Sequence, residues 1–468
     1  MATLIKNGRI VTAVDDYTAD ILVDNGRVQT IGKSVTVGGD VEVHDASGLL
    51  VFPGGVDVHT HLDWEFGPTH TLDTFGTGTK SAAFGGTTTL VDFCNQTVGE
   101  SPLKGLEGWH KRRESACVDV GAHMIMLDVN AKSLEDMKTL IKREGVTSFK
   151  LFMAYPGVLM LDDGSIFKAM RVAGGNGAMT CMHAENGQVI QVLVQEAVAQ
   201  GLKAPKYHAT TRPSILEGEA THRAIRLAEL AGTPLYIVHL SAGEALSVVT
   251  EARDRGIPVH AETCPHYLFL TAEEYERPGF EGAKYVMTPP LRDQHHQHQL
   301  WRGLKTDDLQ VVSTDHCPFC FNEQPYGMKY SKQQGIDSFS KIPNGAPGVE
   351  TRLPLIFEGA VLKQGMSLNR FVEITSTAPA KLFGLFPKKG TIAVGTDADI
   401  VLFDPNEQWV IRAAEQHSRV DYTLFEGRQV TGRVKKVFLR GQCIVDGPKW
   451  LGREGMGQYL SRGESGRI

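Results

Sequence analysis

The sequence has few of the features that mark secreted, membrane or nucleic-acid-binding proteins. It contains no apolar run of about 18 residues and no signal-peptide-like segment at its start. We therefore expect a cytoplasmic protein without membrane contact. The net charge of -6 leaves no surplus of Lys and Arg, which argues against a general nucleic-acid binder. Internal repeats and low-complexity segments are also lacking.

Cysteine is scarce and is arranged without a disulfide pattern. The seven cysteines are an odd number scattered over 468 residues, unlike the framework of a small secreted domain. Cys317 and Cys320 have the spacing of a redox pair, but they follow a predicted strand end without the helix of a thioredoxin-like motif. We therefore do not expect redox chemistry at this pair.

Strands dominate both ends of the chain, and strands alternate with helices between them. Residues 1–51 and 381–447 contain short strands separated by turn signals such as Asn7-Gly8. Residues 52–380 alternate apolar runs with helical stretches, which predicts the α/β class and a (β/α)₈ TIM-like barrel. Each end segment alone would leave a sheet face uncovered, so we expect both to join in one discontinuous β-sandwich domain. Residues 448–468 are expected to form a C-terminal arm that packs on a neighbour or frays.

The apolar periodicity places the individual elements. The predicted barrel strands are 55–58, 88–93, 123–129, 148–154, 179–182, 235–238, 259–262 and 311–314. The predicted helices include 135–143, 188–199, 219–231, 242–255 and 368–383. The predicted sandwich strands are 3–10, 19–24, 27–31, 42–45, 390–392, 399–404, 408–411, 434–439 and 442–445.

Two histidines, His59 and His61, end the first predicted barrel strand. Side chains at positions i and i+2 of a strand lie on the same face, so both imidazoles can point to one place. Later barrel strands also end in polar residues: Lys150, His183, His239 and Asp315. The loops at the carboxyl ends of barrel strands form one rim, where these side chains should converge.

A metal site is the interpretation that this set favours. Each residue alone has a simpler explanation: a lone histidine is more often a hydrogen-bonded barrel residue, Asp315 could cap the next segment, and Lys150 could neutralise a carboxylate. Together, four imidazoles and a carboxylate without a metal would leave buried polar groups poorly paired. Imidazole and carboxylate ligands suit Zn²⁺, although Mn²⁺, Co²⁺ or iron would also fit.

Lys150 needs a separate argument, because an ammonium repels metal ions and has no lone pair. A buried, neutral amine can react with carbon dioxide to form a carbamate. Lys150 would then be an N6-carboxylysine that bridges two metals about 3.5–4 Å apart. In this arrangement one ion is held by His59, His61 and Asp315, and the other by His183 and His239.

At these residues the chain resembles the cyclic-amide hydrolases of the amidohydrolase superfamily, close to the dihydropyrimidinases and hydantoinases. The resemblance extends from Ile5-Lys6-Asn7-Gly8 to 389–392 and 395–399, and all six metal positions carry the family's residue in the right order. It implies a barrel with a side sandwich, two Zn²⁺ per subunit bridged by carboxylated Lys150, and a homotetramer. It also implies hydrolysis of 5,6-dihydropyrimidines or 5-substituted hydantoins to N-carbamoyl amino acids by a hydroxide that bridges the two metals.

Three further residues resemble the family's substrate site. Tyr155 matches a tyrosine that hydrogen-bonds the developing oxyanion, although alone it could be a packed aromatic. Thr288 and Asn344 match positions whose backbone groups hold the amide and imide atoms of the ring. Many relatives have Ser at the position of Thr288, a change that a backbone contact should survive. In the implied reaction, Asp315 also carries the proton from the hydroxide to the leaving nitrogen.

The expected substrate is a small cyclic amide or ureide. The sequence decides neither the size of its ring nor the preference for the D or L form. Asp63 stands where dihydroorotase-like enzymes have a carboxylate-binding arginine, which disfavours an acidic substrate. Leu159 and Pro156 both differ from the residues that are common in relatives, so no D or L preference follows. Apolar rim residues suggest a pocket for a 5-substituent: Trp64, Phe66, Phe152 and Leu159.

Two alternatives remain beside this function. Allantoinase is the closer enzymatic one, because it opens a related ring. A noncatalytic cytoskeletal or signalling scaffold is the other, and it is disfavoured because such relatives have lost metal ligands whereas all six positions are present here.

Overall fold

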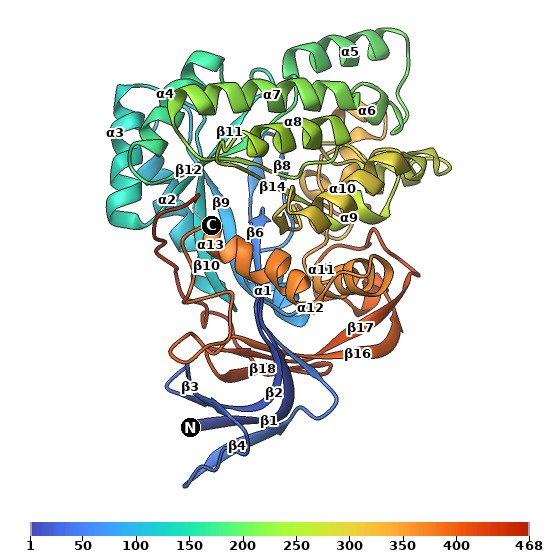
Figure 1. The fold of residues 1–468 in the computed structure, drawn as a ribbon. Helices are drawn as coiled ribbons and strands as arrows, with labels where there is room; N and C mark the ends of the chain where they lie inside the picture. The colour runs from blue at the N-terminus through green and yellow to red at the C-terminus, as the bar shows by residue number, and fades with distance from the viewer. Residues whose placement is uncertain (1, 467–468) are drawn as a thin grey trace.

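The computed structural model describes residues 2–466, in which a barrel lies above a curved sheet (Figure 1). The barrel has eight parallel strands in the order β15-β14-β13-β12-β11-β10-β9-β6. Nearly all of their residues are buried, as is typical of parallel strands covered on both faces. The strands are β6 (Gly55–Thr60), β9 (Thr87–Asn95), β10 (Asp119–Ile125), β11 (Ser148–Phe152), β12 (Met179–His183), β13 (Leu235–Ile237), β14 (Val259–Thr263) and β15 (Val311–Val312). The predicted barrel is confirmed.

Contacts between β6 and the segment after β15 close the barrel. Thr60 pairs in parallel with His316. Inside, Asp57 accepts hydrogen bonds from the backbone N–H of Thr314 at 3.2 Å and from its hydroxyl at 2.6 Å. Because His59 lies in β6, His61 follows this strand directly and Asp315 lies in the segment after β15, this closure brings together residues from opposite ends of the barrel sequence.

Helices surround the barrel strands (Figure 1). Side chains of Thr74, Ser101, Asn130 and Asp162 cap the first four, each accepting a hydrogen bond from an otherwise unpaired N–H of the first turn. The helices are α1 (Phe75–Phe84), α2 (Pro102–Arg112), α3 (Ala131–Thr139), α4 (Asp163–Gly174), α5 (Gly187–Ala199), α6 (Tyr207–Thr210), α7 (Ser214–Ala231), α8 (Gly243–Asp254), α9 (Pro265–Phe269), α10 (Gln294–Thr306), α11 (Arg352–Ile356), α12 (Leu368–Val372) and α13 (Ala378–Leu382). In the part of the chain that the structure describes, no helix is long and apolar enough to cross a bilayer.

A second, nine-stranded sheet combines strands from both ends of the chain, as predicted. It curls on itself: Ala398 donates to the carbonyl of Gly26 at 2.9 Å, and Gly441 donates to the carbonyl of Ala398 at 2.8 Å. An apolar core that includes Ile5, Val23 and Phe438 fills the inside. Its strands are β1 (Ala2–Val11), β2 (Asp16–Asp24), β3 (Arg27–Gly32), β4 (Val41–Asp45), β5 (Leu50–Pro53), β16 (Ile400–Val410), β17 (Gln429–Leu439), β18 (Gln442–Asp446) and β19 (Lys449–Trp450).

Three predicted details of the strands are wrong. Residues 390–392 form a turn at Gly390, whose φ is 83°, and Ile392 is buried in the sheet core without joining a strand. The predicted strands 399–404 and 408–411 are one strand, β16 (Ile400–Val410), because a register shift between Asp404 and Gln408 absorbs the irregular residues. The third barrel strand lies at 119–125 rather than 123–129, since its pairing with β9 begins at Asp119.

The C-terminal arm packs on the barrel of its own chain, as far as Gly466. Val120 donates to the carbonyl of Gln458, and Leu460 donates to the carbonyl of Val120, each at 2.9 Å. The buried guanidinium of Arg462 donates to backbone and side-chain oxygens of β10 and β11. These bonds satisfy backbone groups of β10 and hold the arm in place. Residue 1 of the predicted first domain and residues 467–468 of the arm lie outside the described residues.

Candidate active site

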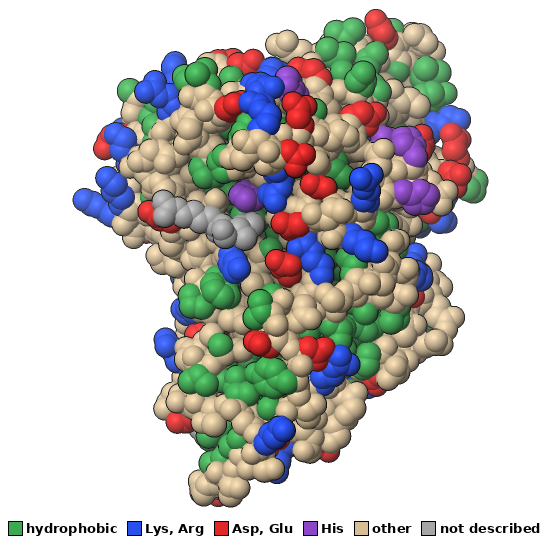
Figure 2. Space-filling model, viewed as in Figure 1, with side chains coloured by type: hydrophobic (Ala, Val, Ile, Leu, Met, Phe, Trp, Pro, Cys, Tyr) green, Lys and Arg blue, Asp and Glu red, His purple; other side chains and the backbone are tan. Residues whose placement is uncertain are grey.

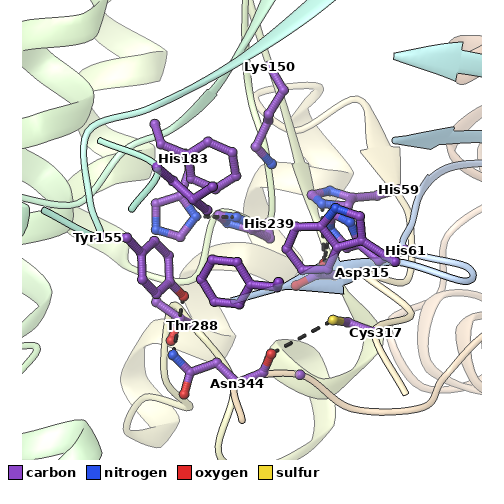
Figure 3. Close-up of a pocket in the computed structure, with 15 residues that line it drawn as sticks. His59, His61, Lys150, Tyr155, His183, His239, Thr288, Asp315, Cys317 and Asn344 are labelled. Atoms are coloured by element: carbon purple, nitrogen blue, oxygen red, sulfur yellow. Dashed lines mark hydrogen bonds and ion pairs between the residues drawn. The ribbon is translucent and has the colours of Figure 1, made fainter. Parts of the chain in front are cut away.

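Every residue predicted for the site lines one pocket at the carboxyl end of the barrel (Figure 3). The shared rim of parallel strands explains why residues far apart in sequence meet there. The lining consists of His59, His61, Trp64, Phe66, Lys150, Phe152, Tyr155, Leu159, His183, His239, Thr288, Asp315, Asn344 and two residues that were not predicted, Cys317 and Gly345.

One group of possible metal ligands consists of His59, His61 and Asp315. The Asp315 Oδ1 atom lies 3.2 Å from His59 Nε2 and 3.5 Å from His61 Nε2. One ligand atom from each residue lies within 4.8 Å of the others. The His59 Nε2 atom is buried and has no hydrogen-bond partner. This donor set therefore fits a metal ion such as Zn²⁺.

Glu262 orients the His59 ring from behind. Its Oε1 atom contacts His59 Nδ1, while its Oε2 atom accepts a hydrogen bond from the Tyr236 hydroxyl at 2.9 Å. A proton on Nδ1 leaves the lone pair on Nε2, the atom that faces Asp315. Burial raises the pKa of Glu262 to about 8, and a cation held by the histidines would favour its ionised form.

The other two histidines form a second pair. His183 Nδ1 and His239 Nε2 lie 2.9 Å apart, so they either share a proton or face the same cation. Glu185 Oε2 lies 2.8 Å from His183 Nε2 and holds that ring in orientation. Burial holds the pKa of His239 well below its usual value, which keeps the neutral imidazole that metals require.

Lys150 points into the space between the two histidine pairs (Figure 3). Its side chain is buried, and its amine lies 4.8 Å from the centre of the Phe93 ring and 5.1 Å from that of Phe152. Burial lowers the pKa of Lys150 to about 8, with Asp315 and Glu262 opposing the shift. A neutral amine, the form that reacts with carbon dioxide, is therefore accessible near neutral pH.

Tyr155, Thr288 and Asn344 lie on the opposite side of the pocket (Figure 3). Tyr155 has a positive φ of 62°, a backbone conformation that is uncommon for a bulky residue. Its hydroxyl accepts a hydrogen bond from Asn344 Nδ2 at 3.3 Å. Burial raises the pKa of Tyr155 to about 12, so the hydroxyl stays protonated and can donate a hydrogen bond to an oxyanion.

The predicted apolar rim residues form one cluster beside these groups. Trp64, Phe152 and Leu159 are buried together, and Phe66 packs against them. The Trp64 and Phe66 rings stack with their centres 5.1 Å apart. These side chains make one side of the pocket apolar, so an apolar substituent of a ligand can pack against it.

Known protein families and proteins are similar to this chain over most of its length. The model of the amidohydrolase family matches residues 50–444. The chain belongs to the amidohydrolase family. The D-hydantoinase of Streptomyces coelicolor is 52% identical over 465 residues, which cover 98% of each protein. The D-hydantoinase of Geobacillus stearothermophilus is 48% identical, covering 100% of this chain and 98% of the relative.

Solved structures agree with this assignment. The dihydropyrimidinase from Brevibacillus agri superposes on this amidohydrolase with a TM-score of 0.97 at 49% identity, covering 100% of both chains. The L-hydantoinase from Arthrobacter aurescens gives 0.88 at 30% identity, covering 98% of this chain and 99% of that one. The resemblance to hydantoinases and dihydropyrimidinases is therefore confirmed.

Asp63 and Cys317 of this amidohydrolase have no predicted role in the reaction, and the structure agrees with that interpretation. Asp63 Oδ1 lies 2.9 Å from His70 Nε2, and Asp63 does not line this pocket, so its carboxylate is occupied by a local hydrogen-bond partner. Cys317 lines the pocket, but burial raises its pKa well above the usual value and the described cysteines are free. The reactive thiolate of a redox pair is therefore disfavoured.

Sequence reasoning missed Glu185 and Glu262, the residues that orient the amidohydrolase histidines. Both carried a signal: Glu185 follows His183 by two residues, and Glu262 ends the predicted strand 259–262. A search for the partner of each histidine's second nitrogen would have indicated them.

Proposed function

We propose that this enzyme hydrolyses the cyclic amide bond of 5-substituted hydantoins and 5,6-dihydropyrimidines to N-carbamoyl amino acids. The observation that carries the proposal is the convergence of four histidines, Lys150 and Asp315 opposite Tyr155 and beside an apolar wall. Relatives of similar length named D-hydantoinase and dihydropyrimidinase support it. Because the D-hydantoinases are the more similar relatives, we propose a preference for D-substrates.

Two Zn²⁺ ions, replaceable by Mn²⁺ or Co²⁺, are the proposed cofactor. The ligands would be His59, His61 and Asp315 on one side, His183 and His239 on the other, and carboxylated Lys150 between them. When bound, such ions supply a nucleophilic hydroxide at neutral pH and polarise the scissile carbonyl.

The remaining steps are assigned to side chains of the chain itself. Tyr155 donates its hydroxyl hydrogen bond to the oxygen that becomes negatively charged. Asp315 accepts the proton released by the nucleophile and passes it to the leaving ring nitrogen. The backbone groups of Thr288 and Asn344 hold the ring amide and imide atoms, and Trp64, Phe66, Phe152 and Leu159 contact the 5-substituent.

A panel of substrates tests this function. Metal-loaded enzyme should hydrolyse D-5-substituted hydantoins and dihydrouracil. Turnover of dihydroorotate should be low, because Asp63 stands at the position where an arginine would bind the carboxylate of that substrate. Allantoin as the best substrate would instead assign the chain to the allantoinase activity. A protein that binds no zinc and hydrolyses none of these compounds would overturn the proposal and restore the scaffold interpretation.

A homotetramer in the cytoplasm is the proposed setting. Hydrophobic side chains gather over α5 (Figure 2), where Val189, Val192 and Val198 are 41%, 51% and 37% exposed. Apolar patches of this kind are typical of contacts between subunits. Light scattering should give a tetramer, and Val192→Glu should weaken the assembly if α5 lies in an interface. A monomer in both proteins would refute this proposal.

The proposed division of the chain keeps the residues 1–51 and 381–447 as the sheet domain, 52–380 as the barrel and 448–468 as the arm. Because β5 (Leu50–Pro53) and β19 (Lys449–Trp450) both pair within the sheet, we propose that the first boundary lies after Pro53 and that the arm begins after Trp450.

A further inference from the structure

A buried lysine outside the predicted site connects two segments of the pocket. Lys332 begins the short helix η6 (Lys332–Gly335), in the long connection between β15 and α11, and its side chain is fully buried. Its ammonium donates hydrogen bonds to the carbonyl oxygens of Val286 at 2.6 Å, Pro343 at 2.7 Å and Gly345 at 2.6 Å. Burial lowers the pKa of Lys332 to about 7. The three carbonyl acceptors favour the ammonium, because each of its three N–H groups then has one acceptor.

These acceptors belong to the two segments whose backbone is assigned to the substrate ring. Val286 precedes Thr288 by two residues, and Pro343 and Gly345 flank Asn344. The Gly345 N–H also donates to the Val286 carbonyl at 3.1 Å. The distance between the two segments is thus held by one buried cation and one backbone hydrogen bond.

The orientation of Asn344 follows from the same contacts. While the carbonyls on either side face Lys332, the Asn344 carbonyl lies 3.8 Å from Cys317 Sγ, at the pocket. Its side-chain amide donates to the Tyr155 hydroxyl at 3.3 Å (Figure 3). Lys332 therefore determines which carbonyl of this segment is presented to the pocket.

Removal of the ammonium would leave three buried carbonyl oxygens close together. The Val286 carbonyl would keep the Gly345 N–H as a donor, and the carbonyls of Pro343 and Gly345 would lose the lysine donor without replacement. Buried carbonyls without donors carry an unfavourable free energy, and their partial charges repel one another. The segments of Thr288 and Asn344 would then separate or rotate, while the metal ligands on β6, β11 and β12 would keep their positions. A loss of ring binding without a loss of metal is the signature of this arrangement.

We propose that Lys332 is a positioning residue for substrate, whose ammonium sets the spacing of the Thr288 and Asn344 backbone groups that bind the ring. The proposal deepens the proposed function and rests on it. Lys332 does not contact the substrate and acts only through the two segments.

Lys332→Met, which removes the charge at similar volume, tests the proposal with 5-methylhydantoin and 5-phenylhydantoin as substrates. KM should rise roughly tenfold or more, with a smaller change in kcat and full metal content. The factor should be the same for both substrates, because the defect concerns the ring and not the substituent. Lys341→Met is the matched control: Lys341 lies on the same connection, is 60% exposed and pairs with Asp337.

The KM and the folding of the Lys332 variants decide whether Lys332 positions the substrate-binding segments. A folded, metal-loaded Lys332→Met enzyme with the parent KM would overturn the proposal. If that variant does not fold, Lys332→Gln, which can keep two of the hydrogen bonds, takes its place. Failure of both to fold would assign Lys332 to folding alone and also refute the proposal. If the parent enzyme hydrolyses neither hydantoin, the proposed function itself fails, which the variants cannot mimic.

Discussion

Replacement of Glu262 by Gln is expected to weaken metal binding while the fold is preserved. Glu262 is fully buried and contacts three groups: the His59 ring, the Tyr236 hydroxyl at 2.9 Å and the His239 backbone N–H at 3.0 Å. Gln has the same shape and can keep its oxygen toward the two histidines, because the Tyr236 hydroxyl can turn to accept from the new amide. In the metal-loaded protein, where the cation favours the ionised form of Glu262, the substitution therefore removes the negative charge behind His59 and little else.

The expected loss of metal affinity follows from the role of carboxylates that orient metal-binding histidines. Loss of an outer carboxylate that orients a metal-binding histidine typically lowers metal affinity about 10- to 100-fold. That corresponds to roughly 1.4–2.8 kcal/mol of binding free energy at 25 °C. Tyr236→Phe is the matched control, because it removes one uncharged hydrogen-bond donor from Glu262 and leaves the carboxylate in place. Its metal affinity should stay close to that of the parent.

Zinc affinity would be measured by competition with a chromophoric chelator in bicarbonate buffer, with circular dichroism to verify folding. An unchanged affinity in a folded Glu262→Gln protein would refute the orientation argument. An equal loss in Tyr236→Phe would attribute the effect to packing around Glu262 instead of to its charge.

Four other perturbations test the proposed Lys150 carbamate, the proton transfer by Asp315 and the contacts between barrel and sheet. Lys150→Ala should lose metal and regain part of it with a small carboxylate, and a fully loaded, active variant would contradict the carbamate. In the parent apoenzyme, metal uptake with bicarbonate should increase as pH rises through about 8, because burial lowers the Lys150 pKa to about 8 and the neutral amine predominates above it. Asp315→Asn should keep most metal yet lower kcat about 10²–10⁴-fold, and Asn tolerates the Asp315 φ of 48°; near-normal turnover would remove the proton-transfer role. Lys389→Met should lower the free energy of unfolding by about 3–5 kcal/mol in urea titrations, because Lys389 lies within 3.0 Å of three buried carboxylates, those of Asp119, Asp397 and Asp399. An unchanged unfolding midpoint would show that these carboxylates are neutral in the fold.

The sequence by itself determined the barrel and the identity of the site. Strand-length apolar runs alternating with helices predict parallel strands, and parallel strands of a barrel share one rim. A residue that ends such a strand, such as Lys150 or His183, is therefore placed at the rim without knowledge of any contact. Boundaries were less certain where irregular backbone replaced a strand, as at Gly390, because side-chain burial does not require a hydrogen-bonded ladder.

Only the tertiary structure decided which atoms act together. Glu262 is 203 residues from His59, and the contact between them determines which ring nitrogen is free for a metal. Lys332 collects carbonyls from two segments, and the arm adds hydrogen bonds to β10. Such contacts depend on distances and directions between backbone segments that have no local signal in the sequence, because hydrogen bonds act over about 3 Å whatever the separation along the chain.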